Sequence, residues 1–273
     1  MSDRVSIEIT DGVADVRLNR PDKLNALDLA MFQALVDAGD RLAQDRSVRA
    51  VVLSGEGRGF CAGLDTGSFN AMAGMDAAGS GAGGFKADLG ARDGDRITNL
   101  AQQAVYAWTE MPAPVIAAVH GVALGGGIQI ALGCDLRVVA PDARMSVMEI
   151  RWGILPDMTG LPMLVRLVGL DVAKDLAFTG RMVSGEEAVR LGLATRVADD
   201  PRAEALALAR EIAGKNPAAI RGIKILLDLA GTRPLAESFL DESRRMGELI
   251  GSPNQVEAIM AELEGRPADF TDE

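Results

Sequence analysis

The fold is decided by residues 115–132, which read VIAAVHGVALGGGIQIAL. The five apolar residues from Val115 to Val119 are typical of a short strand that is buried on both faces. The glycines that follow permit a tight turn, and the run from about Gly126 to Leu132 predicts a helix. Strand, glycine turn and helix in this order are the unit of an α/β core with crossover connections.

A second stretch, residues 50–65, is built in the same way and reads AVVLSGEGRGFCAGLD. A short strand, Ala50 to Leu53, leads into glycines and then into the segment from Phe60 to Asp65. Glycines after a strand let backbone N–H groups point into a cavity, and a helix N-terminus adds partial positive charge. Either stretch alone also fits a tight turn or close helix–strand packing. Two of them together favour a pair of N–H donors aimed at one oxygen, an oxyanion hole.

Other segments extend the α/β pattern on both sides of these stretches. Apolar residues alternate from Val5 to Ile9 and from Val13 to Leu18 around Asp11-Gly12, which predicts a β-hairpin. Asp28 is placed to cap a helix that extends to about Ala43. We also predict helices over about 97–110 and 161–168, a strand over 136–139, and a flexible glycine-rich loop over 63–94.

From Pro201 to Leu263 the sequence contains no strand pattern, only amphipathic helices broken by prolines at 217, 234 and 253. The predicted organisation is therefore an α/β core over residues 1–200 followed by a helical layer over residues 201–273.

Composition limits the partners that this chain can bind. Its 273 residues are 48% hydrophobic and carry a net charge of −11, with a pI near 4.7. Such a charge disfavours nucleic acids and anionic membranes as partners. No apolar run reaches the roughly 18 residues of a membrane span, and the first ten residues lack the pattern of a secretory signal. We expect a cytoplasmic protein.

The chain has one histidine, His120, and two cysteines, Cys61 and Cys134. A metal site built from clustered histidines is therefore excluded, and a Ser-His-Asp triad would have to use His120. That residue ends an apolar strand, where a partly buried turn residue is the simpler interpretation. Both cysteines are expected to be free. Acid–base chemistry in this protein must therefore come from carboxylates.

Four ordered motifs carry a resemblance to a known family. They are residues 19–27 (NRPDKLNAL), residues 60–65 (FCAGLD), residues 120–127 (HGVALGGG) and residues 148–156 (MEIRWGILP). In this order the sequence resembles the enoyl-CoA hydratase/isomerase (crotonase) family, over about Val5 to Arg233. The resemblance implies a core that is a spiral of ββα turns, with C-terminal helices that cover coenzyme A and form trimers or dimers of trimers.

The resemblance also implies a substrate and a set of site residues. The substrate is an acyl-CoA thioester, so coenzyme A belongs to the substrate and no separate cofactor or metal is needed. The backbone N–H groups of Leu64 and Gly126 correspond to the family's oxyanion donors. The residues implied to lie along coenzyme A are Lys23, Ala26, Ala62 and Asp65.

Three polar residues bear on which reaction is catalysed. Hydratases of the family use two glutamates, and Gln129 occupies the position of the first, where it can orient a group but cannot transfer a proton. Glu149 fills the second position. Asp157 follows eight residues later, and this pairing resembles the dienoyl-CoA isomerase branch, although that branch usually has Asp at position 129. We therefore predict isomerisation of an enoyl- or dienoyl-CoA, with Glu149 and Asp157 transferring protons.

Several alternatives stay open at the level of sequence. Glu149 could instead activate water in an atypical enoyl-CoA hydratase, with Gln129 positioning the water. The chain could also be an acyl-CoA-binding protein without activity, whereas a hydrolase would need a nucleophile beside a base. Each residue also has a structural interpretation: a solvent-facing position for Gln129, a surface ion pair for Glu149, and a helix cap for Asp157.

Overall fold

The computed structural model describes residues 3–65, 67, 89–90, 92 and 94–272. Most of the loop predicted over 63–94 lies outside the described residues.

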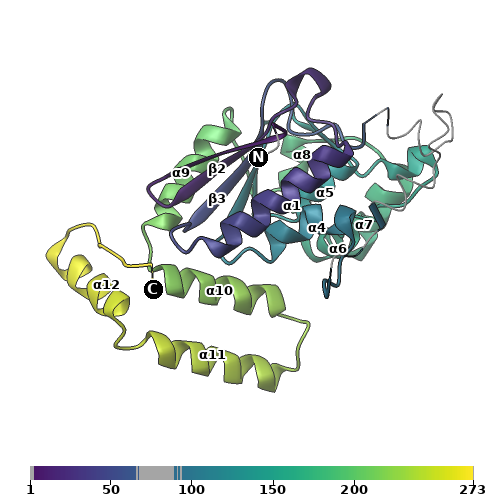
Figure 1. Ribbon diagram of the computed structural model, residues 1–273. Helices are drawn as coiled ribbons and strands as arrows, with labels where there is room; N and C mark the ends of the chain where they lie inside the picture. The colour runs from purple at the N-terminus through teal and green to yellow at the C-terminus, as the bar shows by residue number, and fades with distance from the viewer. Residues whose placement is uncertain (1–2, 66, 68–88, 91, 93, 273) are drawn as a thin grey trace.

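The core is a six-stranded sheet in the order β1-β2-β3-β4-β6-β9. Figure 1 labels two neighbouring strands of this sheet, β2 and β3. The strands β1 (Val5–Thr10) and β2 (Val13–Leu18) pair antiparallel, which confirms the predicted hairpin. All further pairings in this sheet are parallel. They involve β3 (Ala50–Gly55), β4 (Val115–Val119), β6 (Leu136–Val139) and β9 (Arg196–Val197).

Both faces of this sheet are covered by helices. Because successive side chains of a strand point to opposite faces, each strand contributes to two separate cores. In β3, Val51 and Leu53 join the larger hydrophobic core, together with α1 (Leu29–Gln44) and α4 (Leu100–Thr109). Ala50 and Val52 point to the other face, where α9 (Pro201–Ala213) packs. That helix presents alanines four residues apart, and their small side chains let it lie close to the strands (Figure 1).

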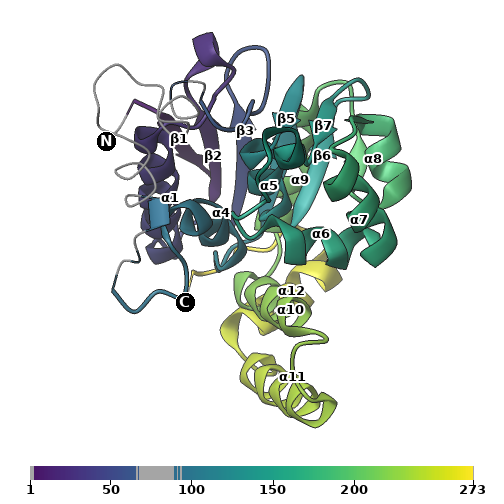
Figure 2. The same ribbon diagram turned by 90° about the vertical axis from the view of Figure 1, so that its right-hand side faces the viewer.

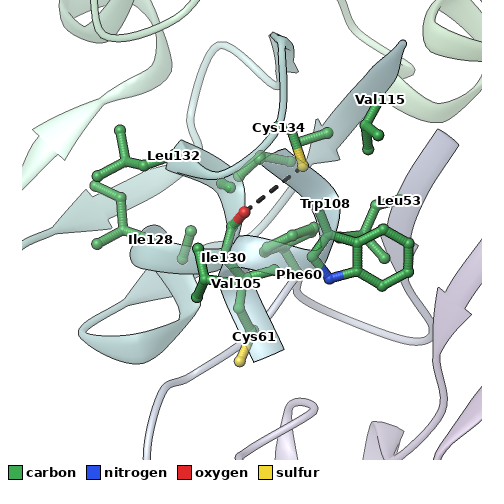
Figure 3. Packing of buried hydrophobic residues seen from close by; sticks show 14 of the residues in the cluster. Leu53, Phe60, Cys61, Val105, Trp108, Val115, Ile128, Ile130, Leu132 and Cys134 are labelled. Atoms are coloured by element: carbon green, nitrogen blue, oxygen red, sulfur yellow. Dashed lines mark hydrogen bonds between the residues drawn. The ribbon is translucent and has the colours of Figure 1, made fainter. Parts of the chain in front are cut away.

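The larger core surrounds Trp108, which is fully buried among side chains from β3, α4 and the segment after β3 (Figure 3). The figure also shows Cys61 and Cys134 within this packing, with the Cys134 thiol donating to the Ile130 carbonyl. The α4 helix begins at Leu100, three residues later than predicted, because Asn99 and Gln102 form a capping box there.

A second, three-stranded sheet has the order β5-β7-β8. Its strands β5 (Val122–Leu124), β7 (Arg144–Ser146) and β8 (Val183–Ser184) are only two or three residues long, too short to show a periodic pattern in the sequence. The short helices beside it are α5 (Gly126–Leu132), the 3-10 turn Glu149–Trp152, α6 (Gly160–Val168), α7 (Leu170–Thr179) and α8 (Gly185–Leu191).

The chain ends in three helices that stand away from the sheet (Figure 2): α10 (Pro217–Leu229), α11 (Leu235–Leu249) and α12 (Pro253–Glu264). The α9 helix, which the predicted boundary at residue 201 assigns to this layer, packs on the sheet instead. Lys224 of α10 forms a 2.7 Å ion pair with Asp135. Arg49 binds the C-terminal tail through the Phe270 carbonyl and the Asp272 carboxylate. Within the described residues, no helix has the length and apolar character needed to cross a membrane.

Candidate active site

The two glycine-containing segments lie side by side and hydrogen-bond to each other. The Cys61 N–H donates to the Val122 carbonyl at 2.9 Å, and the Leu124 N–H donates to the Cys61 carbonyl at 3.0 Å. On its other side the 61–65 segment pairs with Leu27, whose N–H donates to the Gly63 carbonyl at 2.8 Å. The 61–65 segment is therefore held between the N-terminal loop and β5.

This packing leaves two N–H groups unused. Within the described part of the chain, no hydrogen bond engages the N–H of Leu64 or that of Gly126, the first residue of α5. Gly127 allows the close approach, because a Cβ there would lie 2.2 Å from the Cys61 carbonyl oxygen. Both residues are half-buried at the wall of a cavity, so their N–H groups are available to bind a ligand oxygen.

A cavity of about 900 Å³ opens in front of these groups. Its volume lies in the upper range for small-molecule sites, and most of its walls are apolar. The helices α1 and α4 contribute Phe32 and Ala101, which the sequence analysis did not single out. All nine predicted site residues line this one cavity: Lys23, Ala26, Ala62, Leu64, Asp65, Gly126, Gln129, Glu149 and Asp157.

The loop that carries Lys23 and Ala26 is fixed by residues that sequence reasoning missed. Asn25 is fully buried, has a φ of +56°, and its amide donates to the carbonyls of Glu56 and Gly59 at 2.9 Å. Arg20 donates to the Asp65 carboxylate at 2.8 Å and to the Ala26 carbonyl at 3.0 Å. The Asp65 side chain is thus engaged within the protein. The tolerance of Asn for positive φ was the one local signal in the sequence.

Glu149 is buried, with 6% of its surface exposed, and forms no ion pair among the described residues. One carboxylate oxygen, Oε1, accepts a 2.6 Å hydrogen bond from Gln129, whereas Oε2 is buried and has no partner. Burial raises the pKa of Glu149, partly offset by hydrogen bonds from its own backbone and from Gln129, and the nearby Asp157 charge raises it further. A carboxyl with these properties is suited to exchange a proton with a bound ligand.

Asp157 lies on the same cavity, in the segment before α6. The residue is exposed in the isolated chain, yet the protein atoms around its carboxyl displace water and raise its pKa. The N-cap of α6 is Thr159, so the structure does not support the helix-cap interpretation of Asp157. Two carboxyls with raised pKa values therefore face one cavity.

Gln129 does not face solvent, since only 1% of its surface is exposed. Its Oε1 accepts from the backbone N–H groups of Met158 at 2.9 Å and Gly160 at 3.2 Å. Its Nε2 donates to Glu149. The amide thus bonds the protein through both its oxygen and its nitrogen.

Two further side chains with reactive groups, Cys61 and His120, contact other parts of the protein and not the cavity. Cys61 is fully buried and donates to the Asn25 carbonyl, and burial raises its pKa to about 12, so the thiolate nucleophile is absent at neutral pH. The His120 ring contacts the Gly57 carbonyl at 3.0 Å. Neither residue is among those that line the cavity.

Comparison with known proteins extends along nearly the whole chain. A family model described as enoyl-CoA hydratase/isomerase matches residues 8–273. A Bacillus subtilis protein named "Probable enoyl-CoA hydratase" is 32% identical over 98% of this chain and 99% of its own length. The human mitochondrial Delta(3,5)-Delta(2,4)-dienoyl-CoA isomerase is 31% identical, over 93% of this chain and 77% of that protein.

Solved structures agree in fold. An enoyl-CoA hydratase from Bacillus anthracis superposes with a TM-score of 0.86 at 28% identity, over 99% of this chain and 100% of that one. One from Mycobacterium smegmatis gives 0.81 at 33% identity, over 97% and 98% of the two chains. These likenesses confirm the crotonase-like α/β fold that the motifs implied. A family match that spans the sheet, the cavity and the C-terminal helices establishes that this chain belongs to the enoyl-CoA hydratase/isomerase family.

Proposed function

We propose that this enzyme isomerises the double bonds of a 3,5-dienoyl-CoA to the conjugated 2,4-dienoyl-CoA. In this reaction a proton leaves the carbon next to the thioester, a proton is added at the far end of the diene, and both double bonds shift by one carbon. The observation that carries the proposal is that Glu149 and Asp157, both with raised pKa values, face the cavity that the free N–H groups of Leu64 and Gly126 also line.

Each part of the site has a defined role in this reaction. The N–H groups of Leu64 and Gly126 bind the thioester oxygen and stabilise the negative charge of the enolate. One carboxylate removes the proton and the other carboxyl, in its protonated form, delivers one. The burial of Glu149 and the protein atoms around the Asp157 carboxyl raise both pKa values, which favours the protonated form of each carboxyl compared with one in water. Apolar walls suit a hydrocarbon acyl chain.

Coenzyme A extends from the thioester towards the loop residues Lys23, Ala26, Ala62 and Asp65. Among the described residues that line the cavity, Lys23 is the one lysine or arginine, and it is exposed, so it is the proposed partner of a phosphate. Asp65 acts through its main chain, because Arg20 holds its carboxylate. The human relative whose printed name is a dienoyl-CoA isomerase supports this choice of substrate.

Hydration of an enoyl-CoA is the second candidate, because Glu149 keeps one carboxylate oxygen without a protein partner. The names of several relatives favour it. Against it, Gln129 is an amide and cannot transfer a proton, and its oxygen already accepts two backbone N–H bonds, so it could not accept from a water without losing one of them.

The proposal also covers the quaternary structure of the enzyme and its cellular location. The α11 helix buries no residue and exposes large apolar side chains, which suits assembly into a homotrimer or a dimer of trimers. Both cysteines are free, which suits a reducing compartment such as the cytoplasm.

The test compares two substrates on the wild-type enzyme. We expect conversion of a 3,5-dienoyl-CoA, followed by the ultraviolet absorbance of the conjugated product, to be faster than hydration of crotonyl-CoA. Glu149→Gln and Asp157→Asn should each lower the isomerase kcat by about 10²–10⁴. If crotonyl-CoA is hydrated faster than the dienoyl-CoA is isomerised, the enzyme is a hydratase and the proposal is wrong. If acyl-CoA binds but neither substrate is converted, the chain is a binding protein.

A further inference from the structure

The amide of Gln129 has its orientation fixed by its surroundings. Two backbone N–H groups, those of Met158 and Gly160, point at one end of the amide, which must therefore be the oxygen. The NH₂ end is directed at Glu149 Oε1, 2.6 Å away. All three contacts are buried, so exchange with water does not weaken them.

The carbonyl oxygen of the Gln129 amide fixes the backbone of the segment that contains Asp157. Helices usually begin with a residue whose side chain caps the first N–H groups. In α6 the N-cap is Thr159, which has a φ of +67° and makes no capping bond. Gln129 supplies the missing acceptor from a different helix. A Cβ on Gly160 would lie 2.6 Å from Gln129 Cγ, so the glycine is what lets the amide reach this position.

The NH₂ group of the same amide fixes Glu149, the other proposed proton carrier. The hydrogen bond to Oε1 stabilises ionised Glu149 and leaves Oε2 as the oxygen without a protein partner. Gly125 lies next to this carboxyl, because a Cβ on it would be 3.6 Å from Oε1. The Gln129 bond therefore holds the carboxyl, through Oε1, beside the turn that carries the Gly126 N–H.

We propose that Gln129 is a positioning residue that joins the two proton carriers, by fixing the carboxylate of Glu149 through its NH₂ group and the backbone beside Asp157 through its oxygen. The proposal rests on the proposed function for the identity of the proton carriers. Gln129 lines the cavity, and the hydrogen bonds of its amide are made to the protein. A neutral amide supplies a donor and an acceptor together, whereas an ionised glutamate has acceptors alone and would place a second negative charge next to Glu149.

Two variants separate these roles. Gln129→Glu keeps an acceptor for Met158 and Gly160 but loses the donor to Glu149. Gln129→Met, of similar size, loses both. The matched control is Gln103→Met: Gln103 is also buried and also donates to a glutamate, Glu110, at 2.6 Å, but it does not line the cavity.

The measurement is the protonation of Glu149, followed by infrared difference spectra of the carboxyl band across pH, with Glu149→Gln identifying the signal. We expect both variants at position 129 to raise the pKa of Glu149 by about one unit or more, because a charge-assisted hydrogen bond is lost. One limb of the pH–rate profile should move upward by the same amount, while KM changes little. Gln129→Met should also lower Tm, through the uncapped α6.

Gln103→Met should leave the Glu149 signal and the pH–rate profile at their wild-type positions. A folded Gln129→Glu enzyme whose Glu149 band titrates as in the wild type would overturn the inference. If the wild type fails to isomerise dienoyl-CoA but the Glu149 band still shifts in the variants, the proposed function is wrong and the role of Gln129 stands.

Discussion

The buried carboxyl of Glu149, the proposed proton carrier, also affects the stability of the fold. Because burial raises its pKa above the ordinary value of 4.5, the folded protein holds this proton more tightly than the unfolded chain does. The contribution of Glu149 to stability is therefore greatest below pH 4.5 and is lost as the pH rises through the folded-state pKa. Above that pKa the ionised side chain lowers the free energy of unfolding.

We therefore expect Glu149→Gln to raise Tm at pH 7 while it lowers kcat. The gain should be roughly 2–4 °C for each 1 kcal/mol recovered, and it should disappear below about pH 4.5, where the wild-type carboxyl is protonated. Thermal unfolding at a series of pH values measures the difference. A variant less stable than the wild type at pH 7 would mean that the carboxylate is well solvated or paired in the folded state.

At the scale of elements, the start of α5 is placed by its packing on the 61–65 segment, and this sets the position of the Gly126 N–H. Gly126 is the first residue of that helix, a position that accepts proline. Gly126→Pro therefore removes the N–H, whereas Gly126→Ala adds a similar Cβ and keeps it. The Cβ in both variants would press on the movable ends of the Leu27 and Met158 side chains.

We expect Gly126→Pro to lower kcat by about 10²–10³ relative to Gly126→Ala, the usual effect of removing one oxyanion donor. Steady-state kinetics of both variants, with circular dichroism as a check of folding, give this ratio. Equal kcat values in two folded variants would show that the Gly126 N–H does not stabilise the transition state.

At the scale of the whole molecule, the exposed apolar face of α11 is the main feature that a single chain leaves unexplained. Phe239 is 58% exposed and Leu235 is 71% exposed, one turn apart, and Met246 and Ile250 continue the same face. A contiguous apolar face of this kind is usually covered in the native assembly.

We expect the wild type to sediment as a trimer or hexamer, and Phe239→Lys to dissociate it because a charge cannot be buried there without a partner. The control is Glu237→Lys, since Glu237 is exposed and lies on the opposite face of α11 at 100° per residue. Analytical ultracentrifugation of the three proteins measures the outcome. A monomeric wild type would contradict the proposed assembly.

The sequence by itself determined the local elements and the identity of the site segments. The 5–18 hairpin, α1 and the strand–turn–helix unit at 115–132 follow from periodicity and from glycines within a few residues of one another. The ordered motifs identified the family, and the residues they named line one cavity. These features are readable because each depends on neighbours in the chain.

Tertiary structure alone decided how the site residues pair. The bond from Gln129 to Glu149 spans 20 positions, that from Arg20 to Asp65 spans 45, and the strands β5, β7 and β8 exist only because distant segments supply their partners. A polar side chain can bond many groups, and its partner is chosen by the packing that brings one of them within reach. For that reason the sequence could name Gln129, Glu149 and Asp157, but only the folded chain could show that one amide bonds the Glu149 carboxylate and the backbone next to Asp157.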